Sequence, residues 1–594
     1  MKKRKIFALM MASIMLLSAC GQKPADSDAD KDVSQESSKK DTQTQESEIE
    51  DEESKYPEYL NLDSAYPVIK DEYKDELSHK VTAMFGVDAG TTREFDELWI
   101  DTYYNEKYNL DFEVKMVAAQ ALGEQKTLAL NSGDMPDMMW MFFMSSSELY
   151  KYGAVEGILL PLDEYISEEL CPNIYKQVIE NDFVRNLVTA PDGHIYSLPY
   201  LDEENQLSSF PNRYWINEKY LETIGKDLPT TVDEFVDVMY ALKEKDPSGL
   251  GSENFYPLGM TMQRSLAGAL MNGFGYVSTA MKFYGNSASI RDGEVVIPAY
   301  DMDVFQEYLK IMNQFYKDGI IHPSCFTMEE TAAISELLTG ATAGWETPVD
   351  VFGVQDWENW GAMIPLTSDW QEEPETCKPT HVQIGNFVVS ADTEYPELIL
   401  RFADQYFNNE EGCSLDFWGG VPANSEWATE GFVFNTVSED GTSLVAESEY
   451  TDGVGIYAYY CNYLHGQMPL WGNYGSSEAY VKQQLDAGID PEKVKTYYDL
   501  DPTDPNQYGR LSIYERMYPY ATAGFPTIYY VDEKTNQRIT DLETVIYPYI
   551  EEQVALFITG GRSLSETDAF VAELETMGIK ELLDIYRSIM DSRQ

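Results

Sequence analysis

The chain has 594 residues, 43% of them hydrophobic and 24% charged, which is ordinary for a globular protein with a sizeable core. Its 102 acidic and 42 basic side chains give a formal net charge of -60 at pH 7. A surface of that sign repels nucleic acid and anionic headgroups, and no basic cluster beyond residue 5 offsets it. We therefore expect no nucleic-acid partner, and a neutral ligand in preference to an anionic one.

Residues 1–19 are predicted to be an export signal. A basic start precedes an apolar run over 6–17, which is too short to span a bilayer. The following L-S-A-C looks like a bacterial lipobox, in which cleavage before Cys20 leaves a thiol that carries diacylglycerol. Two acyl chains anchor a protein stably. We expect a lipid anchor on the extracellular face of the cell membrane of a Gram-positive bacterium; an ordinary signal peptide with an incidental cysteine is the alternative.

Residues 20–70 are predicted to be the lipidated cysteine and an acidic flexible linker. From Gln22 to about Lys55 the chain is built mainly of Asp, Glu, Ser, Thr, Gln and Lys, without one aromatic residue. This composition cannot bury enough apolar surface to fold. The segment is interpreted as a tether.

The first folded elements alternate between strand and helix. Strands are predicted over 81–87, 110–116 and 138–144, with helices over 92–108 and 124–130 between them. A Ser-Gly-Asp turn separates the second helix from the third strand. This order gives a βαβαβ unit with a parallel sheet, which binds ligands outside the carboxyl ends of its strands.

The turn belongs to a motif that resembles a known family. N-S-G-D-M-P-D-M over 131–138 is similar to the (A/N)-S-G-D-x-P-D segment of family 1 extracellular solute-binding proteins, the receptor lipoproteins of carbohydrate ABC importers. Four further segments agree in the expected order, over 157–166, 192–200, 215–244 and 557–591. In form the chain resembles the long lipoproteins of Firmicutes.

The resemblance implies an α/β, two-lobed periplasmic-binding-protein-like fold of type II, similar to that of maltose receptors, with an interlobe cleft and hinge strands. The first lobe is expected to comprise 71–198 and 373–392, and the second 199–372 and 393–594. A helix over 396–407 is accordingly placed in the second lobe. Several crossings between lobes permit a rigid-body closing motion. The region from about 410 to 525 receives no assignment.

The function implied by the resemblance is that of a monomeric substrate-binding lipoprotein of an ABC importer. It would capture a neutral oligosaccharide between its lobes and deliver it to membrane permease subunits, without catalysis. A secreted glycoside hydrolase acting through two carboxylates is the alternative from another class, and a count of 102 acidic residues cannot exclude it. An adhesin or the ligand-binding subunit of a sensor is a third hypothesis.

A receptor for sugars needs flat aromatic rings for their C–H faces and planar polar groups for their hydroxyls. Trp345 stands in the segment 340–346, which resembles the stretch in which a maltose-type receptor offers a tryptophan to its sugar. Glu346 beside it could hold hydroxyls or be solvated. The other candidate ligand-binding residues are Asp88, Asp137, Trp140, Tyr200, Asn386, Trp418 and Trp471. Burial is the alternative for Trp140, a turn cap for Asp137 and a backbone partner for Asn386.

A calcium site is expected to be lost. Some uronate-binding relatives carry an EF-hand-like D-x-N-x-N-G-x-x-D-E loop after a helix that ends in K-E-K-D. Here Asp246, Ser248 and Asn254 remain as oxygen carriers, while Leu250 and Phe255 replace two ligands. Because calcium takes six or more oxygens, we expect a simple glycine turn and no cofactor.

Overall fold

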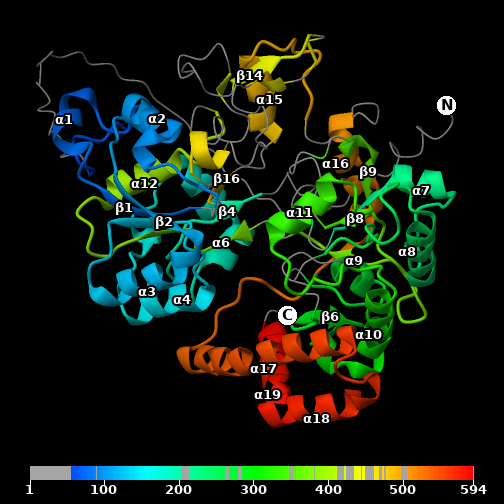
Figure 1. Cartoon of the computed structure of the whole chain (residues 1–594). Coiled ribbons are helices and arrows are strands. Elements are labelled where there is room, and N and C mark those ends of the chain that lie inside the picture. Colours follow the sequence, from blue (N-terminus) through cyan, green and yellow to red (C-terminus); the bar gives the residue numbers. More distant parts are fainter. Residues whose placement is uncertain are drawn as a thin grey trace, which may run out of the picture. The chain divides into compact units, whose positions relative to one another are not determined.

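The computed structural model describes residues 55–87, 90–202, 210, 213–260, 267–278, 284–346, 354, 356–379, 382–410, 421–422, 434–439, 441–442, 444–447, 460–466, 471–473, 477–496, 499 and 505–592 (Figure 1). The predicted export signal, Cys20 and the linker up to residue 54 lie outside these ranges. Within them, no helix combines the length and the apolar character needed to cross a membrane.

A four-stranded sheet forms the centre of the first part of the fold. Its order is β12 (Phe387–Val389), β3 (Met138–Trp140), β1 (Thr82–Val87) and β2 (Glu113–Ala118). β1 pairs in parallel with both β2 and β3, whereas β12 runs antiparallel to β3. The predicted parallel βαβαβ unit is therefore confirmed, with the returning strand added at its edge.

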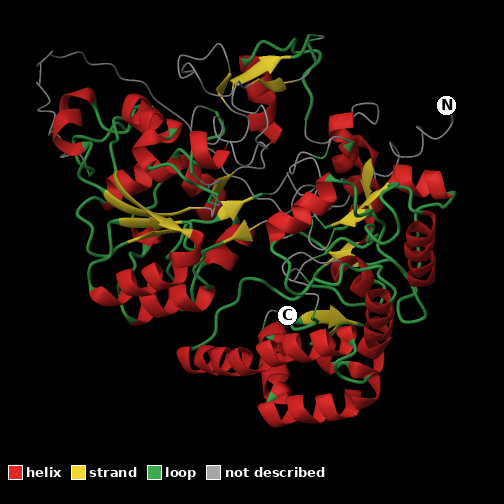
Figure 2. Cartoon of the chain, in the orientation of Figure 1, coloured by secondary structure: helices red, strands yellow, loops and turns green. Residues whose placement is uncertain are grey.

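Helices lie on both sides of this sheet (Figure 2). Side chains of β1 alternate between two cores: Ala83 and Phe85 face a core shared with α2 (Trp99–Tyr108), whereas Met84 faces one shared with α3 (Leu122–Ser132). α3 ends at Gly133, which has φ +72°, a left-handed conformation that glycine adopts without strain. The predicted turn is thus confirmed.

α12 (Pro396–Asp404) packs in the first core, so its predicted place in the second lobe is wrong. Leu398 and Phe402 are buried against the α2 side of the sheet. Asp404 accepts hydrogen bonds from Asn173 Nδ2 and from the backbone N–H of Ile174, both at 2.8 Å. These bonds join α12 to the start of α5 (Pro172–Ile174), within the first lobe.

The linker predicted to extend to residue 70 ends earlier in the structure. Tyr56, Leu60 and Ile69 are buried in the first core, and Leu60 forms a β-bridge with Ile69. The buried Arg401 guanidinium donates to the carbonyl oxygens of Asn61 at 3.1 Å and Ser64 at 2.7 Å. The linker ends here because the sequence again contains apolar residues after residue 55, and these side chains pack in the first core.

A second core surrounds an antiparallel sheet of order β8 (Gly344–Trp345), β5 (Trp215–Asn217) and β9 (Trp360–Ala362). It includes the helices α7 (Glu218–Ile224), α8 (Val232–Lys245) and α10 (Met302–Lys317). α8 begins at a capping box, where Thr231 Oγ1 accepts from the N–H of Glu234 at 3.1 Å.

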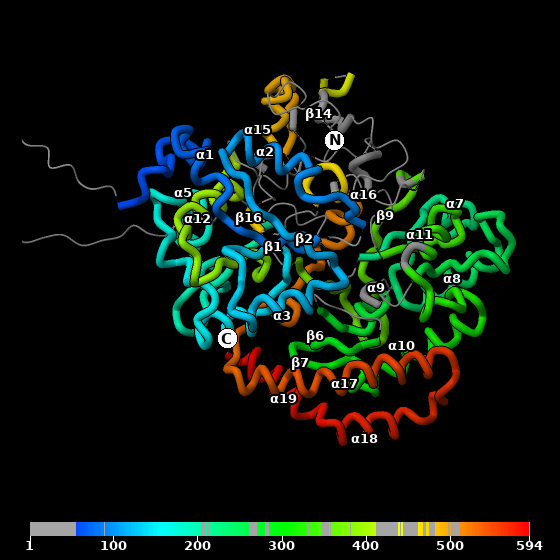
Figure 3. Tube along the Cα trace, turned by 60° about the vertical axis from the view of Figure 1, so that its left-hand side comes forward, coloured from blue at the N-terminus to red at the C-terminus, as the bar shows by residue number. Residues whose placement is uncertain are grey.

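The C-terminal helices complete this second core. α17 (Glu533–Thr559) lies beside α10 in both views, and α18 (Thr567–Met577) and α19 (Ile579–Asp591) pack on α17 (Figures 1 and 3). Asn313 of α10 donates to the carbonyl oxygens of Phe557 at 2.7 Å and Ile558 at 3.1 Å. These bonds satisfy carbonyl groups at the end of α17, which have no partner within the helix.

Short strands join segments that are distant in sequence. β4 (Tyr200–Leu201) pairs antiparallel with β11 (Val382–Gln383) and in parallel with β16 (Gly472–Asn473). β10 (Thr376–Cys377) pairs in parallel with β17 (Ala521–Thr522). β4 begins at Tyr200, close to the predicted boundary between the lobes at 198–199, while hinge motion itself stays a prediction.

The remaining described elements are the helices α1 (Lys74–Leu77), α4 (Ser146–Tyr150), α6 (Asp182–Val188), α9 (Ala267–Asn272), α11 (Glu330–Leu338), α15 (Ser477–Asp486) and α16 (Pro505–Arg516), the π-helix η11 (Tyr460–Leu464), and the strands β6 (Ser289–Arg291), β7 (Glu294–Val296), β13 (Val421–Pro422), β14 (Phe434–Val437) and β15 (Leu444–Glu447).

Candidate functional site

The candidate site is the edge of the first sheet where its parallel strands end. β1, β2 and β3 run in one direction, so the chain leaves all three at this edge. β12 runs the other way, and Asn386, directly before it, reaches the same edge. Loops at the carboxyl ends of parallel strands are where open α/β sheets bind ligands.

The loop that follows β3, residues 141–144, is fixed by the backbone before β12. Met141 N–H donates to the carbonyl of Asn386 at 2.7 Å, and Met144 N–H donates to that of Gly385 at 2.9 Å. Gly385 has φ +87°, and a Cβ there would lie 1.8 Å from the carbonyl oxygen of Met144. Only glycine allows this close approach.

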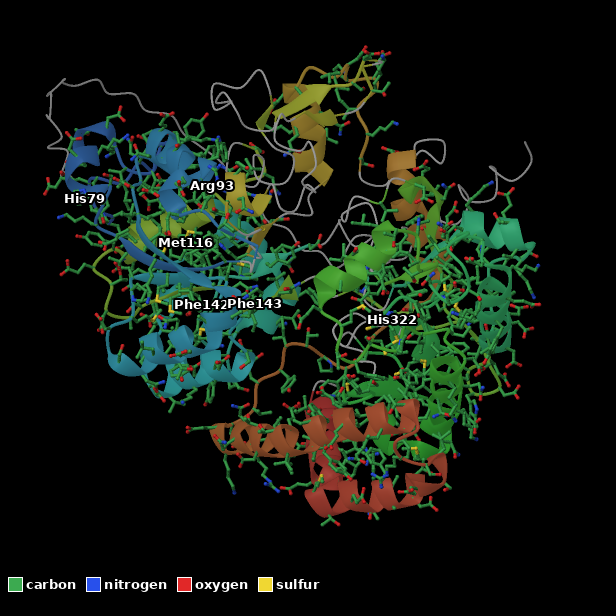
Figure 4. All side chains as sticks on the ribbon, viewed as in Figure 1. His79, Arg93, Met116, Phe142, Phe143 and His322 are labelled. Atoms are coloured by element: carbon green, nitrogen blue, oxygen red, sulfur yellow. The ribbon has the colours of Figure 1, made fainter. Side chains whose placement is uncertain are left out.

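The two phenylalanines of the loop have opposite environments. Phe142 packs into the core shared with α3, whereas the side chain of Phe143 is 46% exposed. Figure 4 shows the two side by side in the first lobe. Met141 and Phe143 also have positive φ angles, of 64° and 49°. Non-glycine residues rarely adopt this conformation, and such strain gathers at functional sites.

The loop that follows β1 is bound to the segment 460–466. Thr91 Oγ1 donates to the carbonyl of Gly466 at 2.5 Å, and Thr92 N–H donates to Asn462 Oδ1 at 2.8 Å. Asn462 Nδ2 donates in return to the carbonyl of Gly90 at 2.9 Å. This part of the region left unassigned by the sequence therefore lies at the candidate site.

Arg93 adds a cation to this edge. Its guanidinium lies 4.3 Å from the centroid of the Tyr463 ring, a cation–π contact (Figure 4). Among the described residues, the structure gives Arg93 no hydrogen bond and no carboxylate partner, although the chain has 102 acidic residues. Its five N–H donors suit hydroxyl or carboxylate oxygens of a ligand.

Sequence reasoning missed Arg93 and Phe143. A basic residue in the loop after the first strand of a strongly acidic chain was an available signal for Arg93. No such signal exists for Phe143, because the apolar run M-W-M-F-F-M does not show which ring leaves the core.

Trp345 lies in β8 and is 1% exposed. It stands directly opposite Trp215 of β5, and both belong to a core that includes Trp360 and residues of α11 and α16. Glu346 follows at the end of the strand. The pKa of Tyr214 is raised well above its usual value, chiefly because Tyr214 is buried and also because the charge of Glu346 lies near. A role of Trp345 and Glu346 in ligand binding stays a prediction.

Asp137 lies at the amino end of β3, at the opposite edge from the loop 141–144, and this corrects its expected place at the ligand-facing end. Its Oδ2 accepts from the N–H of Thr82 at 2.8 Å and from its hydroxyl at 2.7 Å. Its Oδ1 accepts from Thr393 Oγ1 at 2.7 Å. Protein donors therefore bind both carboxylate oxygens, which fastens the starts of β1 and β3 to the residues after β12.

Three further candidate aromatics are buried in the first core. Trp140 packs on Phe85, with ring centroids 5.3 Å apart, and Trp471 stacks on Tyr406 at 3.8 Å. Tyr200 is likewise buried, in β4. Of the predicted residues, the structure places Asn386 and the buried Trp140, the last residue of β3, at the edge described above, whereas Asp88 and Trp418 lie outside the described residues.

The loop that follows α8 does not fit a calcium ion. Asp246 accepts from Ser248 Oγ and, at 2.7 Å, from the N–H of Gly251, so its oxygens are used within the loop. The ammonium of Lys243 donates to the carbonyls of Ser252 at 2.5 Å and Phe255 at 2.6 Å. A protein cation therefore takes up carbonyl oxygens that a metal would need.

Comparison with known proteins adds a family match. A family model described as "Bacterial extracellular solute-binding protein" matches residues 88–412. The curated "Fructooligosaccharide ABC transporter substrate-binding protein FusA" of Streptococcus pneumoniae is 24% identical over 493 residues, which cover 79% of this chain and 82% of that protein.

Solved structures show the same architecture. FusA of S. pneumoniae in complex with kestose has a TM-score of 0.66 at 20% identity, with coverage of 86% of this chain and 99% of that chain. A solute-binding protein of Bifidobacterium longum infantis, titled as binding HMO, has a TM-score of 0.62 at 16% identity, with coverage of 86% and 98%. The predicted two-lobed type II fold is thereby confirmed.

Proposed function

Because the chain belongs to the family of bacterial extracellular solute-binding proteins, we propose that it is the substrate-binding component of an ABC importer and captures a neutral oligosaccharide. The observation that carries this proposal is the likeness to the fructooligosaccharide-binding FusA over 79% of the chain. The complex of that relative with kestose supports an oligosaccharide as the class of ligand.

The chain's own chemistry supports a neutral ligand. A net charge of -60 repels anions at long range, and the edge of the first sheet offers an exposed ring at Phe143 and a guanidinium group at Arg93, with the buried Asn386 directly before β12. Such groups suit the apolar faces and the hydroxyl rim of a sugar. Domain closure around the ligand would present a surface composed of both lobes to the permease.

The experiment is isothermal calorimetry of residues 21–594 against kestose, nystose, maltotriose and a glucuronate oligomer, followed by chromatography of each sugar after long incubation. We expect saturable binding of a neutral oligosaccharide, with every sugar recovered intact. Cleavage of the bound sugar would contradict the proposal, and so would preference for the glucuronate oligomer.

Attachment to the membrane is a second part of the proposal. The L-S-A-C segment over 17–20 supports acylation of Cys20 after cleavage of the export signal. In cells that express the full chain, labelled palmitate should enter the protein, and Cys20→Ser should abolish labelling and release the protein into the medium. Ser18→Thr is the matched control. Labelling of the Cys20→Ser variant would contradict a lipid at this position.

A further inference from the structure

We propose that Phe143 is a platform on which one sugar ring of the bound oligosaccharide packs, and that the loop 141–144 is shaped to present it. The inference rests on the proposed function and deepens it, since it assigns one ring contact to one side chain. It stands on three observations: the exposure of the ring, the backbone conformation of the loop, and the position of the loop in the sheet.

The exposure of Phe143 contrasts with its surroundings. The ring is 46% exposed, whereas Phe142 and Met144 on either side are 3% and 2% exposed. An apolar ring left in water within a buried run loses the free energy that burial would supply. A ligand with an apolar face would recover it.

The loop backbone holds the ring outward. Met141 and Phe143 both have left-handed φ angles, which side chains other than that of glycine rarely adopt. Hydrogen bonds from Met141 and Met144 to the backbone of Asn386 and Gly385 keep the loop in this conformation. The N–H of Gly385 is itself held by Ser197 Oγ at 2.8 Å. The platform is therefore rigid before the ligand arrives, so binding does not have to order it.

The position of the loop and the chemistry of the ring indicate which part of a sugar Phe143 would contact. It leaves β3 at the carboxyl edge of the parallel sheet, beside the loop of Arg93 after β1. A benzene ring has no polar atom, so it contacts the C–H face of a pyranose or furanose ring and leaves the hydroxyls to other groups. Phe143 should accordingly add affinity for neutral sugars of several kinds without distinguishing their hydroxyl patterns.

The test compares variants by calorimetry with kestose, nystose and maltotriose. Phe143→Ala should weaken binding of the preferred sugar about tenfold, which corresponds to about 1.4 kcal/mol. Phe143→Trp should keep the affinity within about threefold, because an aromatic ring remains. The matched control is Phe183→Ala, which removes a ring that is 59% exposed on α6 and should change nothing.

A glycine variant separates binding from folding. Glycine adopts a φ of 49° without strain, so Phe143→Gly should melt at or above the temperature of Phe143→Ala while it binds equally weakly. Wild-type affinity of Phe143→Ala, or an equal loss in Phe183→Ala, would overturn the platform while leaving the proposed function in place. Wild-type protein that binds no sugar of the set would overturn both.

Discussion

Arg93 differs from the other charged residues of the candidate site in having an aromatic ring as its partner. In a chain with 102 acidic side chains, its guanidinium contacts the ring of Tyr463, and no carboxylate of the described residues pairs with it. The aromatic face holds the cation in place without occupying its donors. The loop that carries it is fixed to the segment 460–466 by Thr91 and Thr92, which directly precede Arg93.

We expect Arg93→Ala to weaken oligosaccharide binding about tenfold and to reduce the free energy of unfolding by only about 0.5–1 kcal/mol, the usual size of an exposed cation–π contact. Arg93→Lys should recover stability but not affinity, because lysine lacks the planar fork of donors. Calorimetry and urea unfolding provide the two readouts, with Arg587→Ala on α19 as the control. Full affinity in Arg93→Ala would show that the guanidinium does not contact the sugar.

Protonation of Asp101 in α2 should stabilise the fold at acidic pH. Burial, and after it the charges of Asp111 and Asp96, raise the pKa of its carboxyl to about 6. A carboxyl with a higher pKa in the folded than in the unfolded state destabilises the fold when ionised; this effect is complete above the folded-state pKa of about 6 and is lost as the pH falls toward the unfolded-state pKa of about 4.

Asp101→Asn should therefore raise the free energy of unfolding by about 1 kcal/mol at pH 8, a figure reduced from the full shift because the side chain is only half buried, and should have no effect at pH 4. Melting curves at both pH values measure this. Asp75→Asn on α1 removes an equal charge from an exposed site and serves as the control. An equal gain at pH 4 would mean that the effect is not electrostatic.

The residue scale also shows where sequence reasoning stops. Trp345 and Trp471 were selected because flat rings suit sugars, yet both are buried in cores. The sequence around an aromatic residue in a short strand does not show whether its ring will contact a ligand or another ring. The outcome depends on helices that lie far away in the sequence. For Trp345 these are α11 and α16.

At the scale of elements, the local sequence was sufficient to predict helix ends that are set by a glycine or a capping residue. The end of α3 at Gly133 and the start of α8 at Thr231 each follow from a single residue, a glycine with a left-handed φ and a capping threonine. The lobe of α12 could not be predicted in this way. An apolar helix face shows that it will be buried but not in which core, and the bonds of Asp404 and Arg401 that settle the question involve residues more than two hundred positions away.

The loop that follows α8 is expected to fold without calcium, because the ammonium of Lys243 already binds two of its carbonyl oxygens. Addition of 5 mM calcium or of EDTA should leave the melting temperature unchanged within about 1 °C, whereas an ion that binds only the folded state would raise it with concentration. Lys243→Met should lower the free energy of unfolding by about 2 kcal/mol through loss of charged hydrogen bonds.

Lys245→Met, which removes a lysine of the same turn that donates to one carbonyl, that of Ile224, gives the comparison for that variant and should cost less. A rise of several degrees with calcium in the wild-type protein would contradict the expectation. If calcium restored the free energy of unfolding of the Lys243→Met variant, the ion would be shown to take the place of the ammonium.

At the scale of the whole molecule, the fold has two parts with separate cores, and the chain leaves the first part after β4 and returns to it at β11. The family match agrees with a receptor whose lobes close on a ligand. The family and the fold class could be predicted from the sequence because both rest on ordered motifs; the segments 55–70 and 460–466 could not, because their partners lie elsewhere in the chain.

Closure predicts that ligand compacts the molecule. Small-angle scattering should give a smaller radius of gyration in saturating oligosaccharide than in the free protein, since binding favours the closed state. An equal mass concentration of glucose, which controls for solvent contrast, should leave the radius unchanged. Identical radii with and without a ligand that calorimetry shows to be bound would contradict a closing motion.

The packing of residues 55–70 on the first core has a mechanical consequence. If Cys20 carries the proposed lipid, a force transmitted along the chain enters the folded body at residues 55–70, which pack in the first core. The first lobe would then be the one held near the membrane, and the second lobe would be the freer of the two to move.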